Sequence, residues 1–174
     1  MPLSSSAPTV RYIPDAIADH AARFAALVRE LPWDDRIRAR RTASVGRPYD
    51  YSGLTYPAAP IPPLIAEVAA IAARHAGHGF DNCLANYYAS GDNTMGFHAD
   101  AYDQLVPTSW IAIVSLGSPR PLVFRSRDRR TLVQHDLAPG SLLLMDRATQ
   151  DGWTHAIPRA DAGPRISLTF RQFA

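Results

Sequence analysis

The sequence predicts a mainly β fold of the α+β class, an antiparallel sandwich or jelly roll with two helices covering one outer face. From residue 82 onward, short apolar runs alternate with turn formers such as Gly91-Asp92-Asn93 and Pro139-Gly140. About eight short strands at this spacing are typical of a sandwich or jelly roll. We expect them at residues 83–89, 95–100, 110–116, 121–126, 131–137, 141–146, 153–157 and 165–171.

Two amphipathic segments predict helices ahead of these strands. In residues 15–31 apolar side chains recur at helical spacing between Asp15, which we expect to cap the helix, and Pro32, which ends it. Residues 62–76 show the same pattern and are followed by Gly77, a suitable C-cap. A short strand is expected at Val10–Ile13.

The segment 33–60 is polar, aromatic and rich in turn formers, and predicts two or three short strands and turns outside the main core. Arg36, Arg38 and Arg40 alternate as on one face of an edge strand. A substrate lid would use such arginines for phosphates and the nearby tyrosines for stacking, whereas the alternative is an ordinary solvated loop region. We therefore expect a single domain, 1–174, with helices and lid in 1–80 and the jelly-roll core in 81–174.

The amino-acid composition indicates the size of the hydrophobic core and the cellular compartment of the protein. At 174 residues and 47% hydrophobic content, the chain can bury a sizeable core in one domain. Its 18 basic residues are all arginines, and its net charge is +2. Cys83 is the single cysteine, which fits a reducing compartment. With no pattern of a signal peptide or membrane span, we expect a soluble, cytoplasmic monomer.

His98 and Asp100 form the first candidate for chemistry. Two residues apart in the predicted strand 95–100, they would share one face of that strand. A histidine and a carboxylate at this spacing can occupy neighbouring positions on one metal ion, and His155 is the candidate third ligand. Two histidines and one carboxylate with the opposite side open are the pattern of non-heme Fe(II) oxygenases. A lone His-x-Asp is common by chance, so the hypothesis depends on the residues around it.

The predicted strand 165–171 supplies those residues, because polar and apolar side chains alternate strictly along it. A buried arginine needs an anionic partner, so two arginines on an inward face would suit opposite ends of a small diacid. The same alternation also fits a solvent-exposed face. Asn86 and Tyr88 form a further pair that shares a face. The polar face of the strand carries Arg165, Ser167, Thr169 and Arg171.

Taken in order, these motifs resemble the AlkB family of 2-oxoglutarate- and Fe(II)-dependent dioxygenases. The resemblance is carried by Asn86-x-Tyr88, His98-x-Asp100, residues 153–158 (WTHAIP) and residues 164–171 (PRISLTFR). Weaker similarity runs through Arg41–Gly46 and residues 51–55, so the resemblance covers about residues 38–173. It implies a double-stranded β-helix, the jelly roll of these enzymes, with a short substrate lid.

The resemblance also implies a set of cofactors and their ligands. Fe(II) would be bound by His98, Asp100 and His155, and O₂ would be the oxidant. The co-substrate 2-oxoglutarate would be held by Asn86, Tyr88, Arg165, Ser167, Thr169 and Arg171. Arg165 and Tyr88 are expected at the distal carboxylate, and Arg171 and Asn86 nearer the metal.

The substrate implied by the resemblance is an alkylated base in DNA or RNA, demethylated with release of formaldehyde and succinate. Members that repair DNA carry an acidic residue just beyond His-x-Asp, where this chain has Tyr102, followed by Asp103. Val45 stands where relatives often have an aromatic that stacks on the base. No apolar finger for opening a duplex is evident, so single-stranded substrates are favoured. The candidate substrate contacts are Tyr51, Tyr102, Asp103, Arg41 and Val45.

Two other functions stay open at this point. The same chemistry could serve a small molecule, a free nucleotide or a protein side chain, which Tyr102, Val45 and the modest net charge favour. A catalytically silent jelly-roll binding module would predict a broken metal triad or missing arginines, and the sequence shows neither.

Overall fold

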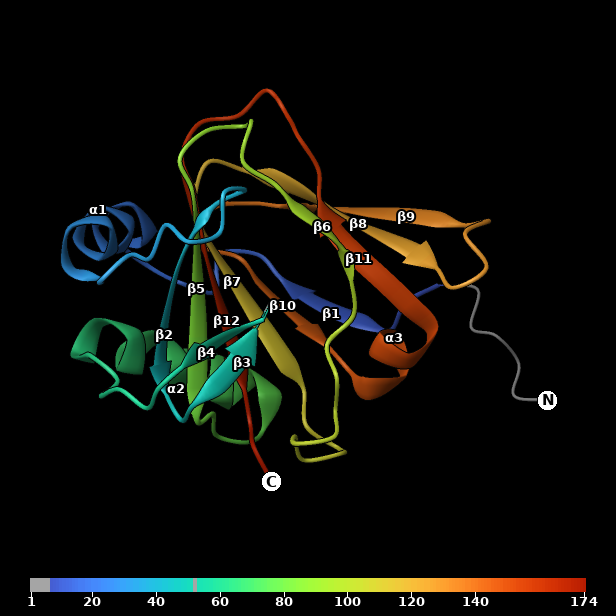
Figure 1. Ribbon diagram of the computed structural model, residues 1–174, viewed down its shortest axis with the longest axis horizontal. Coiled ribbons are helices and arrows are strands. Elements are labelled where there is room, and N and C mark those ends of the chain that lie inside the picture. Colours follow the sequence, from blue (N-terminus) through green and yellow to red (C-terminus); the bar gives the residue numbers. More distant parts are fainter. Residues whose placement is uncertain (1–6, 52) are drawn as a thin grey trace.

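Two antiparallel sheets face each other in the computed structural model, which describes residues 7–51 and 53–174 but not the side chain of Tyr51 (Figure 1). In spatial order, the larger sheet contains β1 (Val10–Ile13), β10 (Leu142–Met145), β7 (Ile111–Gly117), β12 (Arg165–Arg171), β5 (Asn82–Tyr88) and β2 (Arg41–Gly46). The smaller sheet contains β6 (Met95–His98), β11 (Trp153–Ile157), β8 (Arg120–Ser126) and β9 (Leu132–Leu137). Apolar side chains from both sheets form one buried cluster between them. The predicted mainly β jelly roll is thus confirmed.

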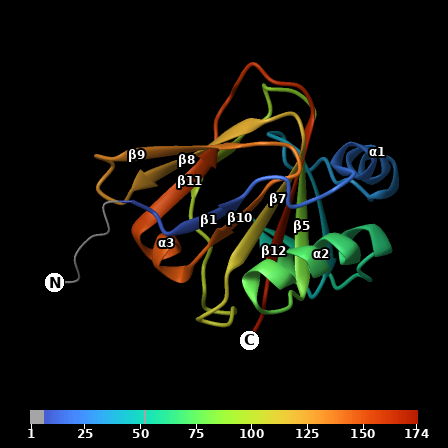
Figure 2. The same cartoon turned by 180° about the vertical axis from the view of Figure 1, so that it is seen from behind.

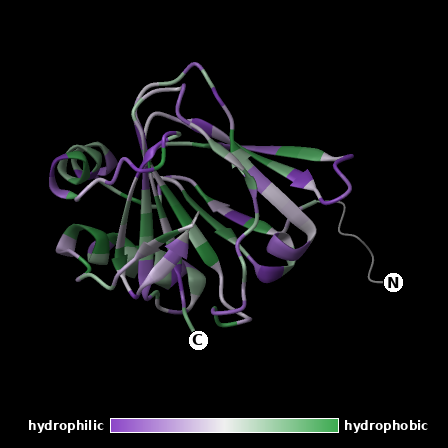
Figure 3. Ribbon diagram, viewed as in Figure 1, coloured by the Kyte–Doolittle hydropathy of each residue, from purple (hydrophilic) through white to green (hydrophobic). Residues whose placement is uncertain are grey.

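The helices α1 (His20–Glu30) and α2 (Pro63–Ala76) cover the outer face of the larger sheet (Figure 2). Leu27, Ile65 and Val68 from the helices are buried in the same core as Leu168 and Phe170 of β12. Apolar residues accordingly gather in α2 and in the strands of this sheet (Figure 3). No helix in the described part of the chain is long and apolar enough to cross a membrane.

The first helix is shorter than predicted. It begins at His20, and its N-cap is Asp19 rather than Asp15; both aspartates have a φ of 53°. The amide of Ile17 donates to the carbonyl of Gly140 at 2.9 Å, which holds the preceding residues as a turn against the loop between β9 and β10. A tertiary contact therefore overrides the helical spacing before His20. The second helix agrees with its prediction and ends at Gly77 in the left-handed region, with a φ of 80°.

The segment 33–60 divides between the core and a separate hairpin. β2 extends the larger sheet beside β5, which corrects the expectation that this whole segment lies outside the core. β3 (Tyr49–Tyr51) and β4 (Leu54–Tyr56) form an isolated two-stranded sheet. The arginines at 36, 38 and 40 lie in bends and turns rather than on an edge strand. Of these, Arg36 pairs with Asp34 and Arg40 is buried, so they do not form one basic face.

A third helix, α3 (Arg147–Gly152), connects β10 to β11 and was not predicted. The carboxylate of Asp146 accepts a hydrogen bond from the amide of Thr149 at 2.8 Å, a typical N-cap. The helix places Gln150 in the interior, 2% exposed, next to the candidate site.

At one end of the molecule, two loops that cross between the sheets are joined to each other (Figure 1). The loop after β5 meets the loop before β12 through Gly91, whose amide donates to Ala162 at 2.9 Å and whose carbonyl accepts from Ala160 at 3.0 Å. A Cβ on residue 91 would overlap the carbonyl of Ala160. Only glycine therefore permits this close approach.

We expect Gly91→Ala to lower the free energy of unfolding by about 2 kcal/mol or more, because the loops would have to separate. Urea unfolding followed by circular dichroism measures the change. The matched control is Gly79→Ala, where an added Cβ meets nothing within 4 Å. Equal stability of the two variants would show that the joined loops contribute little.

Candidate active site

The smaller sheet brings two histidines together. His98 on β6 and His155 on β11 are register partners, and their ring centres lie 4.4 Å apart. The Nδ1 of His98 donates to the carbonyl of Gly96 at 2.9 Å, which fixes the orientation of the ring. The Nδ1 of His155 is buried and has no hydrogen-bond partner among the described residues. A buried imidazole nitrogen without a partner is what a metal ligand offers.

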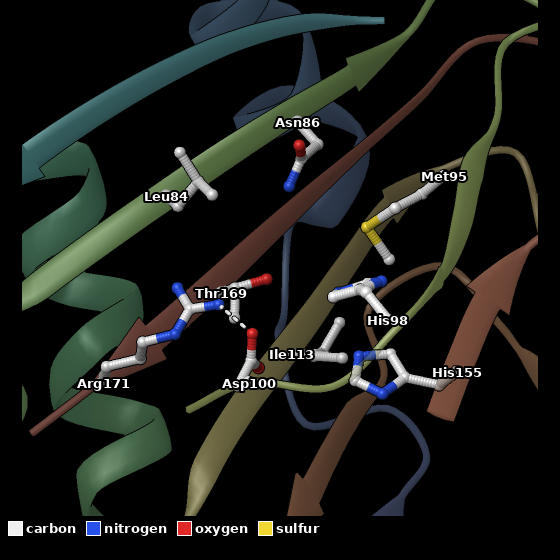
Figure 4. A pocket seen from close by; sticks show the side chains of 9 residues that line it. All are labelled: Leu84, Asn86, Met95, His98, Asp100, Ile113, His155, Thr169 and Arg171. Atoms are coloured by element: carbon white, nitrogen blue, oxygen red, sulfur yellow. Dashed lines mark hydrogen bonds and ion pairs between the residues drawn. The ribbon is translucent and has the colours of Figure 1, made fainter. Parts of the chain in front are cut away.

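Asp100 reaches the same place by a route that differs from the prediction. β6 ends at His98, so Asp100 lies beyond the strand and strand alternation does not set its direction. Instead, its amide donates to the Oε1 of Gln150 at 2.8 Å, which anchors the main chain here. One carboxylate oxygen, Oδ1, accepts from Arg171 at 3.0 Å, and the two imidazoles lie across from this ion pair (Figure 4).

The charges around these groups shift their pKa values. Burial alone would raise the pKa of Asp100, but the charge of Arg171, followed by those of His155 and His98, outweighs it and lowers the pKa. Burial lowers the pKa of His155 to about 3, with repulsion from His98 adding to the effect and Asp100 opposing it. At neutral pH, Asp100 is therefore a carboxylate and His155 a neutral imidazole, the forms that bind a metal.

The donor set of His98, Asp100 and His155 fits Fe(II), because two imidazoles and one carboxylate form the facial triad of non-heme iron sites. Within the described residues, no three such side chains already stand at the spacing of a closed metal site. The Asp100 carboxylate bonds Arg171 in this arrangement, so a metal would have to share it with that guanidinium. Two properties of His155 support the fit of Fe(II) to these residues: its Nδ1 has no hydrogen-bond partner among the described residues, and its imidazole is neutral at neutral pH.

The strand β12 lines the cavity beside these residues, and all seven of its residues are buried. The solvent-exposed alternative for its polar face is thereby excluded. Arg165 pairs in register with Tyr88, Ser167 with Asn86, and Thr169 with Leu84 of β5. One cavity is lined by His98, Asp100, His155 and Arg171, and a second by Tyr88, Arg165 and Ser167. The two cavities share Asn86, Met95, Ile113 and Thr169, so they lie end to end in the space between the sheets.

Arg165 and Tyr88 mark the end of this space farther from the histidines. One guanidinium nitrogen of Arg165, Nη2, donates to the hydroxyl of Ser115 at 3.0 Å. Its Nε and Nη1, and the hydroxyl of Tyr88, are buried without a hydrogen-bond partner among the described residues. Burial lowers the pKa of Arg165; Tyr88 opposes the shift and the charge of Arg120 adds to it. Unmet donors on a buried cation suit a carboxylate.

Two residues that support the site were missed at the level of sequence. Arg40, 6% exposed, donates from Nε to the Oδ1 of Asn86 at 2.8 Å and so orients that amide. Gln150 holds the main chain of Asp100 from α3. Asp146 followed by Thr149 was the available signal for α3, whereas nothing in the sequence marks Arg40 as distinct from its neighbouring arginines.

Two predicted substrate contacts are buried in the core. Val45, 5% exposed, belongs to the core between β2 and the helices, because Ala43 and Val45 face α2 while Thr42 and Ser44 face the other way. Tyr102, 8% exposed, is packed in the core between the sheets, and its hydroxyl donates to the carbonyl of Ser109 at 2.9 Å.

The other three candidate contacts lie in different settings. Arg41 is exposed at the start of β2, on the same face as Val45 by strand alternation, which does not favour a substrate contact. The side chain of Tyr51 lies outside the described residues. Asp103 is exposed and lines a hollow of about 190 Å³.

One contact, between Tyr49 and Arg171, links this hollow to the candidate metal site. The guanidinium carbon of Arg171 lies 4.5 Å from the ring centre of Tyr49, and Tyr49 also lines the hollow. Asp50 and Asp103 give the hollow a negative lining. Its full lining is Tyr49, Asp50, Ala101, Asp103, Gln104, Leu105 and Phe173.

The family model and the curated relatives that match this chain are all oxygenases or demethylases of one kind. A family model, the 2OG-Fe(II) oxygenase superfamily, matches residues 19–171. The DNA oxidative demethylase ALKBH2 of Mus musculus is 36% identical over 151 residues, covering 80% of this chain and 63% of that protein. The Alpha-ketoglutarate-dependent dioxygenase alkB homolog 3 of Bos taurus is 31% identical over 170 residues, covering 85% and 59%. The chain thus spans about three-fifths of the length of these curated relatives.

A solved structure shows the same fold at lower sequence identity. The structure of OsALKBH1 matches with a TM-score of 0.72 and 17% identity, covering 95% of this chain and 99% of that one.

The depressed pKa of His155 predicts how acid affects stability in protein kept with a chelator. Above the ordinary pKa of 6.5, neither state binds a proton at His155; below it the unfolded chain does and the folded chain does not until about pH 3. Stability should therefore fall with pH below 6.5, by up to about 1.4 kcal/mol per pH unit from this residue. The stability that the lowered pKa of Asp100 contributes is lost at still lower pH, below the ordinary carboxyl pKa of 3.8.

Urea unfolding of the wild type and His155→Gln between about pH 7 and pH 4 tests this expectation. The variant should show the shallower decline. Parallel curves for the two proteins would contradict the assigned pKa.

Proposed function

Because this chain belongs to the 2OG-Fe(II) oxygenase superfamily, we propose that it is a dioxygenase that oxidatively demethylates N-alkylated bases of DNA or RNA. The superfamily is defined by Fe(II) and 2-oxoglutarate, which confirms the predicted cofactors, and the relatives named ALKBH2 and alkB homolog 3 confirm the AlkB-like resemblance.

One observation carries the activity: the cavity of the His98–Asp100–His155 cluster adjoins the cavity of the buried donors of Arg165 and Tyr88, and the two share four lining residues. A molecule with a metal-binding end and a distant carboxylate matches the two cavities together. Iron with 2-oxoglutarate and O₂ supplies the oxidation of a methyl C–H bond, converting 2-oxoglutarate to succinate and carbon dioxide.

The chain's own residues would bind and orient the reactants. His98, Asp100 and His155 would hold the iron, and Arg165 with Tyr88 would receive the distal carboxylate. Arg171 would lie at the metal end, where it already bonds Asp100. Buried Ser167 and Thr169 line the space between these ends.

The acid-lined hollow beside Tyr49 supports an N-alkylated base as substrate. Bases such as N1-methyladenine and N3-methylcytosine are cationic, and the carboxylates of Asp50 and Asp103 would favour a cation there. Asp103 would thus take the acidic role that the resemblance places at the position of Tyr102. Tyr49, which lines the hollow, contacts Arg171, and Arg171 in turn bonds the proposed iron ligand Asp100.

Four finer predictions accompany this proposal. The preferred nucleic acid is single-stranded, the protein is a monomer in the cytoplasm, and residues 1–174 act as one domain. Strands β1 and β2 support the last of these, since they complete the larger sheet from the N-terminal part of the chain.

Purified protein with Fe(II), 2-oxoglutarate and O₂ should form succinate even without substrate, and His98→Ala should reduce this at least about a hundredfold by removing a metal ligand. Nuclear magnetic resonance of the succinate methylene protons measures the rate. His75→Ala, at the end of α2 away from the site, is the matched control. Equal succinate formation by the wild type and His98→Ala would contradict the dioxygenase assignment.

We expect Asp103→Asn to lower kcat/KM for single-stranded DNA containing N3-methylcytosine by about tenfold, the value of one lost charge contact of about 1.4 kcal/mol. Released formaldehyde is the readout, and succinate formation without DNA should not change. The exposed Asp161→Asn serves as the control. Activity on free nucleotides or small molecules but on no methylated DNA or RNA would favour the alternative substrate class.

A further inference from the structure

Arg120, the first residue of β8, has no role in the site as described so far, yet it is 1% exposed and among the largest fully buried side chains. Its guanidinium contacts the two loops that cross between the sheets. Nη2 donates to the carbonyls of Asn93 at 2.8 Å and Pro158 at 2.7 Å, and Nη1 donates to that of Ser90 at 3.4 Å. Arg120 therefore holds together the end of the molecule where Gly91 joins the same loops.

These partners are all neutral, so the charge of Arg120 is not compensated by them. Within the described residues, no carboxylate forms an ion pair with Arg120 or with Arg165, and the Nε atoms of both are buried without a hydrogen-bond partner. A buried guanidinium without an anion is costly. The two buried guanidiniums, of Arg120 and Arg165, therefore indicate that an anion binds at this end of the interior.

The two cations share a neighbour. The guanidinium carbons of Arg120 and of Arg165 each lie 5.2 Å from the ring centre of Tyr88. Burial lowers the pKa of both arginines, and the charge of Arg120 lowers that of Arg165 further. A carboxylate at Tyr88 and Arg165 would relieve this repulsion, whereas a neutral group would not.

Building on the proposed function, we propose that Arg120 is a positioning residue for the co-substrate, whose buried charge makes the Tyr88–Arg165 end of the cavity select dicarboxylic over monocarboxylic 2-oxo acids. Arg120 acts through Tyr88 and through its electrostatic field, while Arg165 lines the cavity directly. Its three carbonyl contacts keep the guanidinium at this end.

Binding measured without turnover tests this role. The protein is loaded with Mn(II) and kept free of O₂, and titration calorimetry gives its Kd for 2-oxoglutarate and for 2-oxobutanoate, which lacks the distal carboxylate. The variants are Arg120→Met, which removes the charge, and Arg120→Lys, which keeps it. Arg130→Met, on the exposed turn between β8 and β9, is the matched control. Thermal unfolding by circular dichroism establishes that each variant is folded.

We expect Arg120→Met to weaken 2-oxoglutarate binding at least about tenfold and to change 2-oxobutanoate binding less than about twofold, because the lost charge acts on the second carboxylate. Arg120→Lys should keep most of the preference for 2-oxoglutarate. If Arg120→Met does not fold, Arg120→Gln, which keeps hydrogen-bond donors without the charge, is measured in its place with the same expectation.

Two results would overturn the role. One is unchanged 2-oxoglutarate binding by the neutral variant, and the other is equal weakening of both acids, which a purely structural residue would produce. Failure of the wild type itself to bind 2-oxoglutarate would instead refute the proposed function, so the two failures are distinguishable.

Discussion

Burial of positive charge is the constraint on which the rest of this structure depends. The interior holds the guanidiniums of Arg40, Arg120, Arg165 and Arg171, and Asp100 is the single buried carboxylate among the described residues. Charge is expensive inside a protein unless it is paired and hydrogen-bonded. Bound 2-oxoglutarate would add two negative charges to this interior, where the strands of the jelly roll hold Arg165 and Arg171 at fixed positions.

Much of this fold and of its site could be predicted from the sequence because it depends on local periodicity. Alternation along 165–171 separated the polar face of β12 from the apolar face that packs on the helices. The turn formers between apolar runs predict the eight strands β5 to β12 to within one residue at each end, apart from β6, which ends two residues earlier than expected. His98, Asp100 and His155 line one cavity, as their spacing predicts, although Asp100 lies beyond the strand on which it was expected.

What could not be predicted depends on contacts between distant residues. The anchor of Asp100 is Gln150, fifty residues away on a helix that the sequence signalled only through Asp146. Val45 was named as a substrate contact from the resemblance, although the apolar Ala43 and Val45 alternate with the polar Thr42 and Ser44, which indicates the side that faces the core. Arg120 was indistinguishable from exposed arginines, since three carbonyls from two separate loops define its environment.

The two halves of the proposed site belong to different sheets, and this has a mechanical consequence. The histidines stand on β6 and β11 of one sheet, and Asn86, Arg165 and Thr169 on β5 and β12 of the other. At one end the sheets are fastened by the loops around Gly91, and near the histidines by the ion pair of Asp100 with Arg171. A rigid ligand bound to residues of both sheets would hold the two sheets at a fixed separation. The distance from metal to co-substrate anchor is thus a property of sheet spacing rather than of any single loop.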